Sequence, residues 1–134
     1  MTSTDSFEAF MTSRLAASTA FVNGDVEPLV ALSASTSPAT IFGPAGTAVE
    51  GADEINAANA AGARSFEPSA RNEFDVLHQD SDDRLAYWVG VQRSTVRMHD
   101  QDEPVTLALR VTEVFRREDA GWVLVHRHAD PLRS

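Results

Sequence analysis

The sequence of 134 residues contains no cysteine and no lysine, and it has no long hydrophobic run. Without cysteine, the chain can form no disulfide, no thiolate-bound metal site and no cysteine nucleophile. Without lysine, it excludes Schiff-base chemistry and the phosphate-binding lysine of P-loop proteins. No stretch approaches the roughly 18 consecutive apolar residues that span a bilayer, so we expect no membrane partner.

The N-terminal residues 1–5 are polar and lack the basic and apolar regions of a signal peptide, which predicts a cytoplasmic location. All 11 basic residues are arginine, and 20 acidic residues give a net charge of −9. Nucleic-acid binding requires a basic surface that releases counterions from phosphates. We therefore predict no nucleic-acid partner, and we attribute the acidity mainly to solubility.

The length and the hydrophobic fraction of 43% are typical of one globular domain over residues 1–134. Apolar residues recur at spacings of three and four over residues 6–22, which predicts an amphipathic helix capped by Asp5 or Ser6. Two further helices are predicted over residues 26–34 and 52–64.

The second half of the sequence is rich in β-branched and aromatic residues, which is typical of strands. A short hairpin precedes it, and the predicted strands comprise residues 40–42, 47–49, 72–78, 85–96, 105–117 and 122–128. Short turns between the last four imply an antiparallel meander, and their length predicts a strongly curved sheet. Gly90 is a candidate bulge or bend. The order of elements indicates an α+β fold with a cavity between helices and sheet.

Two consecutive strands carry an Arg-x-Thr-x-Val-Phe-Arg-Arg pattern over residues 110–117, then Gly-Trp at 121–122 and His-x-His at 126–128. Together with Phe-Gly-Pro at 42–44 and the Gly-Ala-Asp-Glu-Ile sequence at 51–55, these motifs resemble the NTF2-like superfamily, and within it the SnoaL-like proteins. The resemblance covers nearly the whole chain.

The resemblance implies a cone-shaped barrel, in which N-terminal helices pack on a strongly curved, mostly antiparallel sheet. It also implies a pocket between sheet and helices, and a homodimer formed through the sheet. The superfamily includes ketosteroid isomerases, polyketide cyclases, dehydratases and kinase association domains, so the fold does not fix an activity. We expect no cofactor.

Alternation along the last strand predicts that His126, His128 and Asp130 share a face with its large apolar residues, and that Arg127 lies on the other face. One interpretation is a catalytic cluster at the mouth of the cavity, in which Asp130 and His128 move protons. Another is a pair of structural histidines near a dimer contact. A metal site is a third, but the other two histidines lie near predicted turns, and we predict no metal.

Arg110 stands in the middle of an apolar strand, where an unpaired guanidinium is costly to bury. It can bind the anionic group of a ligand at the cavity floor. Alternatively, it forms an ion pair, for instance with Glu113 or Asp130, or it lies exposed on the outer face of the sheet. These alternatives remain open at the level of sequence.

Tyr87 and Trp88 occupy opposite faces of one predicted strand, so one of them faces the cavity. Tyr87 is the only tyrosine and resembles the proton donor of ketosteroid isomerases, although their acidic partners have no match here. Together with Phe42 and His126, Trp88 is a candidate lining residue of the pocket, although aromatic core is an equally simple interpretation.

Two hypotheses of function follow. The first is a small-molecule pocket protein, with an anionic ligand, that acts as a cofactor-independent isomerase, cyclase or hydrolase. The second is a non-catalytic binding or association module. Apolar residues on both faces of the last two strands indicate that something covers the outer face of the sheet, and the resemblance implies that this is a second copy.

Overall fold

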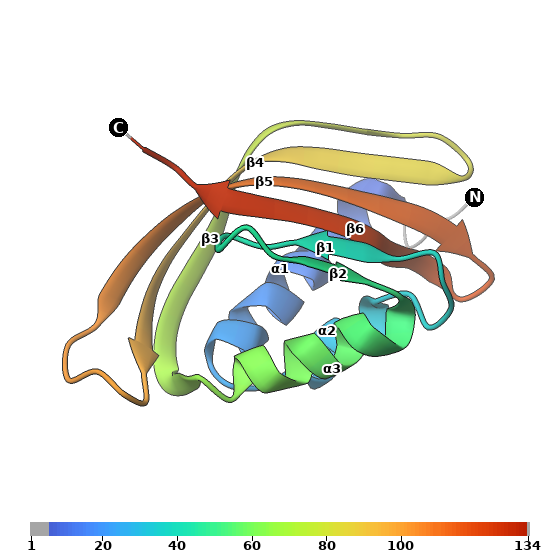
Figure 1. Ribbon diagram of the computed structural model, residues 1–134. Coiled ribbons are helices and arrows are strands. Elements are labelled where there is room, and N and C mark those ends of the chain that lie inside the picture. Colours follow the sequence, from blue (N-terminus) through green and yellow to red (C-terminus); the bar gives the residue numbers. More distant parts are fainter. Residues whose placement is uncertain (1–5, 134) are drawn as a thin grey trace.

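The computed structural model describes residues 6–133 and contains helices followed by a sheet (Figure 1). The helices are α1 (Phe7–Val22), α2 (Glu27–Leu32) and α3 (Ala52–Ala63). The strands are β1 (Thr40–Phe42), β2 (Ala48–Glu50), β3 (Phe66–Ser81), β4 (Leu85–Met98), β5 (Val105–Glu118) and β6 (Gly121–Pro131). The predicted elements are therefore present, with shifted ends.

The six strands form one sheet in the order β2-β1-β6-β5-β4-β3. Strands β3 to β6 pair antiparallel in chain order, which confirms the predicted meander. The β1–β2 hairpin extends the sheet, and β1 pairs in parallel with β6. The sheet is strongly curved over the helices, but β2 and β3 remain at its edges, so the cone is open rather than a closed barrel (Figure 1).

Helix α1 lies against the inner, concave face of the sheet (Figure 1). Its N-cap is Ser6, whose side chain accepts a hydrogen bond of 3.1 Å from the backbone N–H of Ala9. The alternative cap, Asp5, lies outside the described residues. Phe7 packs its ring against Phe115 and Trp122 in the core. No helix in the described part of the chain is long and apolar enough to cross a membrane.

Strand β3 begins six residues earlier than predicted, at Phe66 instead of residue 72. The added segment contains Pro68, which argues against a central strand because proline donates no backbone hydrogen bond. It is accommodated here because β3 forms an edge of the sheet. The extension brings Phe66 against helix α1, where its ring contacts Phe21 at 5.6 Å between centroids.

Besides a register shift between Glu67 and Arg71 near the start of β3, the pairing of the described strands has two irregularities. In β3, the register against β4 shifts between Val76 and His78, directly opposite Gly90. The backbones approach so closely that a Cβ built on Gly90 would lie 2.1 Å from the carbonyl oxygen of Asp75. Gly90 is thus a bend point, as its position in the sequence suggested.

The second irregularity lies in β6, whose register against β5 shifts between Val114 and Phe115. Leu124 pairs with Phe115 and His126 with Val114, so Val125 is the additional residue of a bulge. The alternation of β6 side chains between the inner and the outer face of the sheet is therefore interrupted at Val125. This single extra residue decides which side chains of β6 face the helices.

Replacing Gly90 with alanine tests the close approach of β3 and β4. We expect Gly90→Ala to lower the free energy of unfolding by about 3 kcal/mol, because the clash is with backbone and cannot be relieved by a side-chain rotation. Urea denaturation followed by tryptophan fluorescence measures the change. Thr95→Ala, on the outer face of the same strand, is the matched control and should stay within about 0.5 kcal/mol of wild type. Equal stability of the two variants would contradict the packing described.

Candidate functional site

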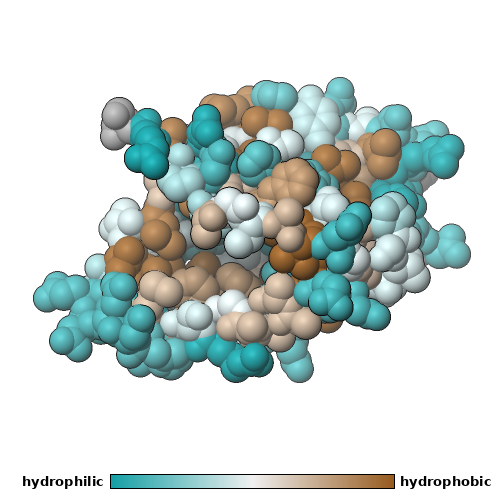
Figure 2. All heavy atoms as spheres, viewed as in Figure 1, coloured by the Kyte–Doolittle hydropathy of each residue, from teal (hydrophilic) through white to brown (hydrophobic). Residues whose placement is uncertain are grey.

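A cavity of about 270 Å³ lies between the helices and the inner face of the sheet. Figure 2 shows the corresponding face hollowed below the β1–β2 hairpin, with mainly apolar side chains around the opening. Most of the wall is apolar and includes Phe21, Val22, Leu29, Leu107, Leu109 and Leu124. The cavity thus has the character of a small-molecule pocket, apolar with a few polar groups.

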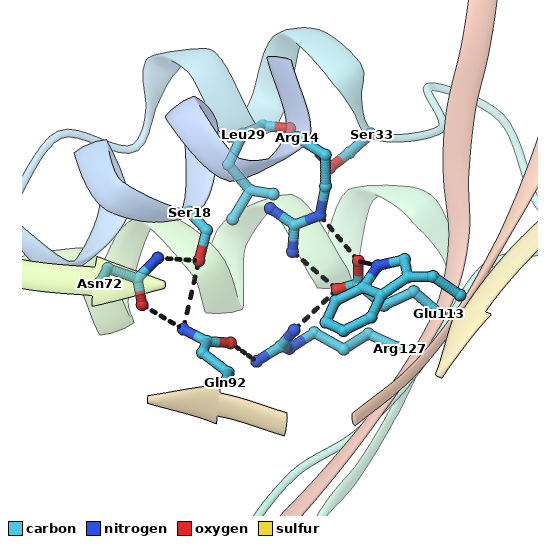
Figure 3. A network of polar contacts seen from close by, with 9 residues as sticks. Arg14, Ser18, Leu29, Ser33, Asn72, Gln92, Glu113 and Arg127 are labelled. Carbon is cyan, nitrogen blue, oxygen red and sulfur yellow. Dashed lines mark hydrogen bonds and ion pairs between the residues drawn. The ribbon is translucent and has the colours of Figure 1, made fainter. Parts of the chain in front are cut away.

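Six polar side chains of the described residues line the cavity. They come from α1, α3, β4 and β6, and they are Arg14, Ser18, Asn59, Gln92, Ser94 and Arg127. Figure 3 shows that most of them belong to one continuous hydrogen-bond network. At one end of the network, two arginines converge on a carboxylate, and this is the most strongly charged feature of the interior.

That carboxylate is Glu113 of β5, whose side chain has no exposed surface. Arg14 binds it in a bidentate fashion, with Nε 2.8 Å from Oε1 and Nη2 2.7 Å from Oε2. Arg127 donates to Oε2 at 2.7 Å, and the indole of Trp88 donates to Oε1 at 2.8 Å. Four hydrogen bonds therefore occupy the acceptor capacity of one carboxylate.

Burial by itself raises the pKa of Glu113, but attraction to Arg14 and Arg127 outweighs it and lowers that pKa to about 2. Burial lowers the pKa of Arg127 as well, yet a guanidinium starts so far above neutral pH that it keeps its charge. The group of three thus carries two positive charges and one negative charge. Nη1 of Arg14 is also buried and has no hydrogen-bond partner among the described residues.

Arg14 and Arg127 were not among the predicted site residues. Arg14 lies on the apolar stripe of α1, seven residues after the buried Phe7, and a cation on such a stripe signals a buried partner. That signal was present in the sequence. Arg127 carried no such signal, because regular alternation places it on the outer face and only the bulge at Val125 turns it inward.

The predicted cluster of the last strand lies on the outer face of the sheet, away from the helices. His126, His128 and Asp130 share that face, as predicted, but they do not share it with Trp122 and Leu124, which are buried in the core. The physical reason is again the bulge, which inverts the alternation after Leu124. The expectation that this cluster lies at the mouth of the helix-covered cavity is therefore wrong.

The expectation that Arg110 lies at the cavity floor is also wrong. Its side chain is 64% exposed and forms a bidentate ion pair with Asp130, at 2.7 and 2.8 Å. This hydrogen bond from Arg110 lowers the pKa of Asp130, which makes the carboxylate a weaker proton acceptor. The Nε2 atom of His128 lies 3.8 Å from Asp130. Proton transfer by Asp130 and His128 stays a prediction.

Among the site residues predicted from the sequence, Phe42 lines the cavity, next to the Gly43–Pro44 turn. Its ring packs edge-on against both His126 and His128, with centroids 5.1 and 5.6 Å apart. His126 Nδ1 lies 2.7 Å from the hydroxyl of Thr40. Burial, followed by repulsion from His128, lowers the pKa of His126.

Tyr87 and Trp88 occupy opposite faces of β4, as predicted. Trp88 is fully buried, stacks on Phe74 and supports Glu113, but it does not line the cavity. Tyr87 faces outward, where its hydroxyl lies 3.1 Å from Nδ1 of His78. Among residues 6–133, no group of three or more histidines and carboxylates is arranged to hold a metal ion.

Removing the carboxylate of Glu113 tests the charge cluster. Glu113→Gln leaves two buried guanidinium groups without an anion, and we expect it to lower the free energy of unfolding by about 3–5 kcal/mol at pH 7. Chemical denaturation measures this loss. Glu118→Gln, which removes a partly exposed partner of Arg116, is the matched control and should cost no more than about 1 kcal/mol.

The same carboxylate has a predictable pH dependence. Because folding lowers the pKa of Glu113 to about 2, its contribution is present above pH 5 and is lost as the pH falls toward 2. The difference in unfolding free energy between wild type and Glu113→Gln should therefore shrink over that range. A difference that stays constant down to pH 2 would show that Glu113 is not ionised in the folded protein.

The fold is shared with known structures of low sequence identity. An NTF2-like superfamily protein from Salmonella enterica superposes with a TM-score of 0.77, at 14% identity over 92% of this chain and 87% of that one. A protein of the NTF2-like family from Streptomyces avermitilis, provisionally named a dehydratase, gives 0.76 at 21% identity over 95% and 96%. The CaMKII hub homology domain of Chlamydomonas reinhardtii gives 0.69 at 22% identity over 96% and 100%.

These similarities show the fold alone, and none of the curated proteins matches the sequence. The sequence profile of the SnoaL-like domain, in contrast, matches residues 12–132 and so includes most of α1, the hairpin and the whole meander. Fold and profile agree with the resemblance carried by the motifs of the last two strands. The chain belongs to the SnoaL-like family, and its fold is that of the NTF2-like superfamily.

Proposed function

We propose that this protein binds a small organic anion, with an apolar body, in the cavity between the helices and the sheet. The observation that carries this proposal is the excess positive charge of the cavity wall. Arg14 and Arg127 both line the cavity, while their shared partner, Glu113, compensates only one of the two charges.

Glu113 cannot compensate a second charge, because its two oxygens already accept four hydrogen bonds. Arg127 uses two of its donors on Glu113 and Gln92, and a guanidinium has five N–H groups. Within the part of the chain that the structure describes, unused donors therefore remain on Arg127 and on Nη1 of Arg14. A carboxylate or similar anion supplies the missing charge and acceptors, since an uncompensated buried charge costs several kcal/mol.

The volume and walls of the cavity constrain the rest of the ligand. About 270 Å³ is at the small end of ligand pockets, which supports a compact molecule rather than a steroid-sized one. The leucine and phenylalanine walls favour a hydrocarbon body. The ligand class that fits is a small aliphatic or aromatic acid.

Binding without chemistry is the function that this geometry supports best. The described lining contains no histidine, aspartate, glutamate or tyrosine, so the cavity offers no proton-transfer group with a pKa near neutral pH. Glu113 is not such a group, because its pKa is about 2. Turnover of a bound acid would instead support the isomerase, cyclase or hydrolase hypothesis.

The charge of the pocket can be tested with methionine variants. We expect a small carboxylate at about 100 times its Kd to stabilise the wild type by roughly 2.7 kcal/mol, a rise in Tm on the order of 10 °C. Arg127→Met should abolish this rise while leaving a balanced Arg14–Glu113 pair. Arg110→Met, with its guanidinium on the outer face, is the matched control and should respond like wild type. Equal stabilisation by neutral carboxamides would contradict the proposal.

We further infer that a second copy of the chain covers the outer face of the sheet. A hollow of about 390 Å³ on that face is lined by Val89, Val91 and Leu132 around the Arg110–Asp130 pair. Leu77, which also lines it, is 67% exposed. An apolar hollow with an ion pair suits a self-complementary contact, and the similarity to a hub homology domain supports association.

The dimer is tested by light scattering at micromolar concentration. We expect wild type to have twice the chain mass of 14.5 kDa and Leu77→Glu to have the monomer mass, because a buried glutamate would lack a partner in the contact. Val30→Glu places the same change on the exposed part of α2 and should stay dimeric. A monomeric wild type would contradict the inference.

A further inference from the structure

Beyond the arginines, the network continues into five uncharged polar side chains of the described residues, which are Ser18, Thr19, Asn72, Gln92 and Ser94. Gln92 accepts a hydrogen bond of 2.7 Å from Nη2 of Arg127 through its Oε1 atom. Its Nε2 atom lies 2.9 Å from Oδ1 of Asn72 and 3.2 Å from the hydroxyl of Ser18. Figure 3 shows Gln92 as the link between the arginines on one side and Ser18 and Asn72 on the other.

Arg127 determines the donor and the acceptor in each hydrogen bond of this uncharged part of the network. A guanidinium only donates, so the atom of Gln92 that faces Arg127 is its carbonyl oxygen and the opposite atom is its amide nitrogen. That nitrogen donates to Asn72, so the facing atom of Asn72 is its own oxygen. The nitrogen of Asn72 then points to Ser18, at 3.0 Å, and to Thr19, at 3.4 Å.

These directions fix the protons of two serine hydroxyls. Ser94 lies 2.7 Å from Oδ1 of Asn72, which is an acceptor, so Ser94 donates its proton there. Ser18 accepts from two amide nitrogens, one of Asn72 and one of Gln92, and these use both of its lone pairs. Ser94 therefore retains unused acceptor capacity, and Ser18 retains an unused O–H donor.

Both residues line the cavity, and their hydroxyls bind the two polar atoms of one carboxamide, that of Asn72. Both residues are also buried, at 5% and 6% exposure. Within residues 6–133, no side chain or backbone group accepts the proton of Ser18 or donates to the oxygen of Ser94. One unused donor and one unused acceptor thus belong to two residues that flank one carboxamide in the wall of an apolar cavity.

We propose that Ser18 and Ser94 form a subsite for an alcohol hydroxyl of the ligand, which makes the ligand class a small hydroxylated carboxylate. This rests on the proposed anion-binding function of the same cavity. A hydroxyl accepts from Ser18 and donates to Ser94, so it satisfies both groups. A ketone or an ether only accepts and an ammonium only donates, so each leaves one serine opposed by a like group.

The test uses cyclohexanecarboxylates that carry hydrogen, hydroxyl, oxo or methoxy at ring position 3 or 4, with cyclohexanecarboxamide as the uncharged control. Isothermal titration calorimetry gives each Kd for the wild type. We expect, at one ring position or the other, the alcohol to bind about tenfold more tightly than the ketone and the methyl ether. Ketones or ethers that bind as tightly as the alcohols at both positions would overturn the subsite.

Ser94→Ala is the informative variant, because Oδ1 of Asn72 still accepts a hydrogen bond from Gln92 in its absence. Ser18→Ala is less informative, because it would leave one N–H group of Asn72 and one of Gln92 without an acceptor. We expect the ratio of alcohol to ketone affinity to fall to about one in Ser94→Ala and to recover in Ser94→Thr. Thr95→Ala, next in sequence but on the outer face, should keep the wild-type ratio. A preference for the alcohol that survives Ser94→Ala would assign it to other residues and overturn the proposal.

Failure of the subsite and failure of the proposed function give different results. If the parent acid binds in an Arg127-dependent way and the alcohol gains nothing, the anion site stands and the hydroxyl subsite is wrong. If the carboxamides bind as tightly as the carboxylates, the anion site is wrong, and the proposed hydroxy acid ligand is wrong with it.

Discussion

The burial of one carboxylate determines much of the interior of this protein. Glu113 has no exposed surface, and an ionised group in that position is stable only when cations and donors surround it. Helix α1, strand β4 and strand β6 each supply one of its partners, Arg14, Trp88 and Arg127 respectively. The helix and the sheet are therefore joined by a charged contact at the same place where the cavity opens between them.

Two ion pairs of similar geometry show how much their surroundings matter. Arg14–Glu113 and Arg110–Asp130 are both bidentate, and both have contacts of 2.7 Å. The first is buried beside an apolar cavity, where the removal of one partner would leave an uncompensated charge at a high cost in stability. The second lies on an accessible face, where water and salt weaken it. Geometry alone does not distinguish a structural pair from a binding group.

Most of the fold was predictable from the sequence, and the candidate site was predictable only in part. Helical spacing, β-branched runs and short turns gave the elements, the meander and the bend at Gly90, because these depend on local preferences and on period. The site depends on a bulge at Val125, which inserts one residue and exchanges the faces of Arg127 and His126. A strict period of two cannot reveal such an insertion. Arg14 was detectable in principle, since it interrupts an apolar stripe, but its partner lies 99 residues away in sequence.

The fixed direction of the hydrogen bonds that begin at Arg127 has an evolutionary consequence. A side chain at position 127 that presented an acceptor would require Gln92 to turn its nitrogen toward it, and Asn72 would have to turn over in step. Ser94 would then accept from Asn72 and keep an unused O–H donor, and Ser18 would donate and keep an unused acceptor, in a cavity of nearly unchanged shape. A change at this one position can therefore exchange the donor and the acceptor in the cavity wall while the outline of the cavity remains the same.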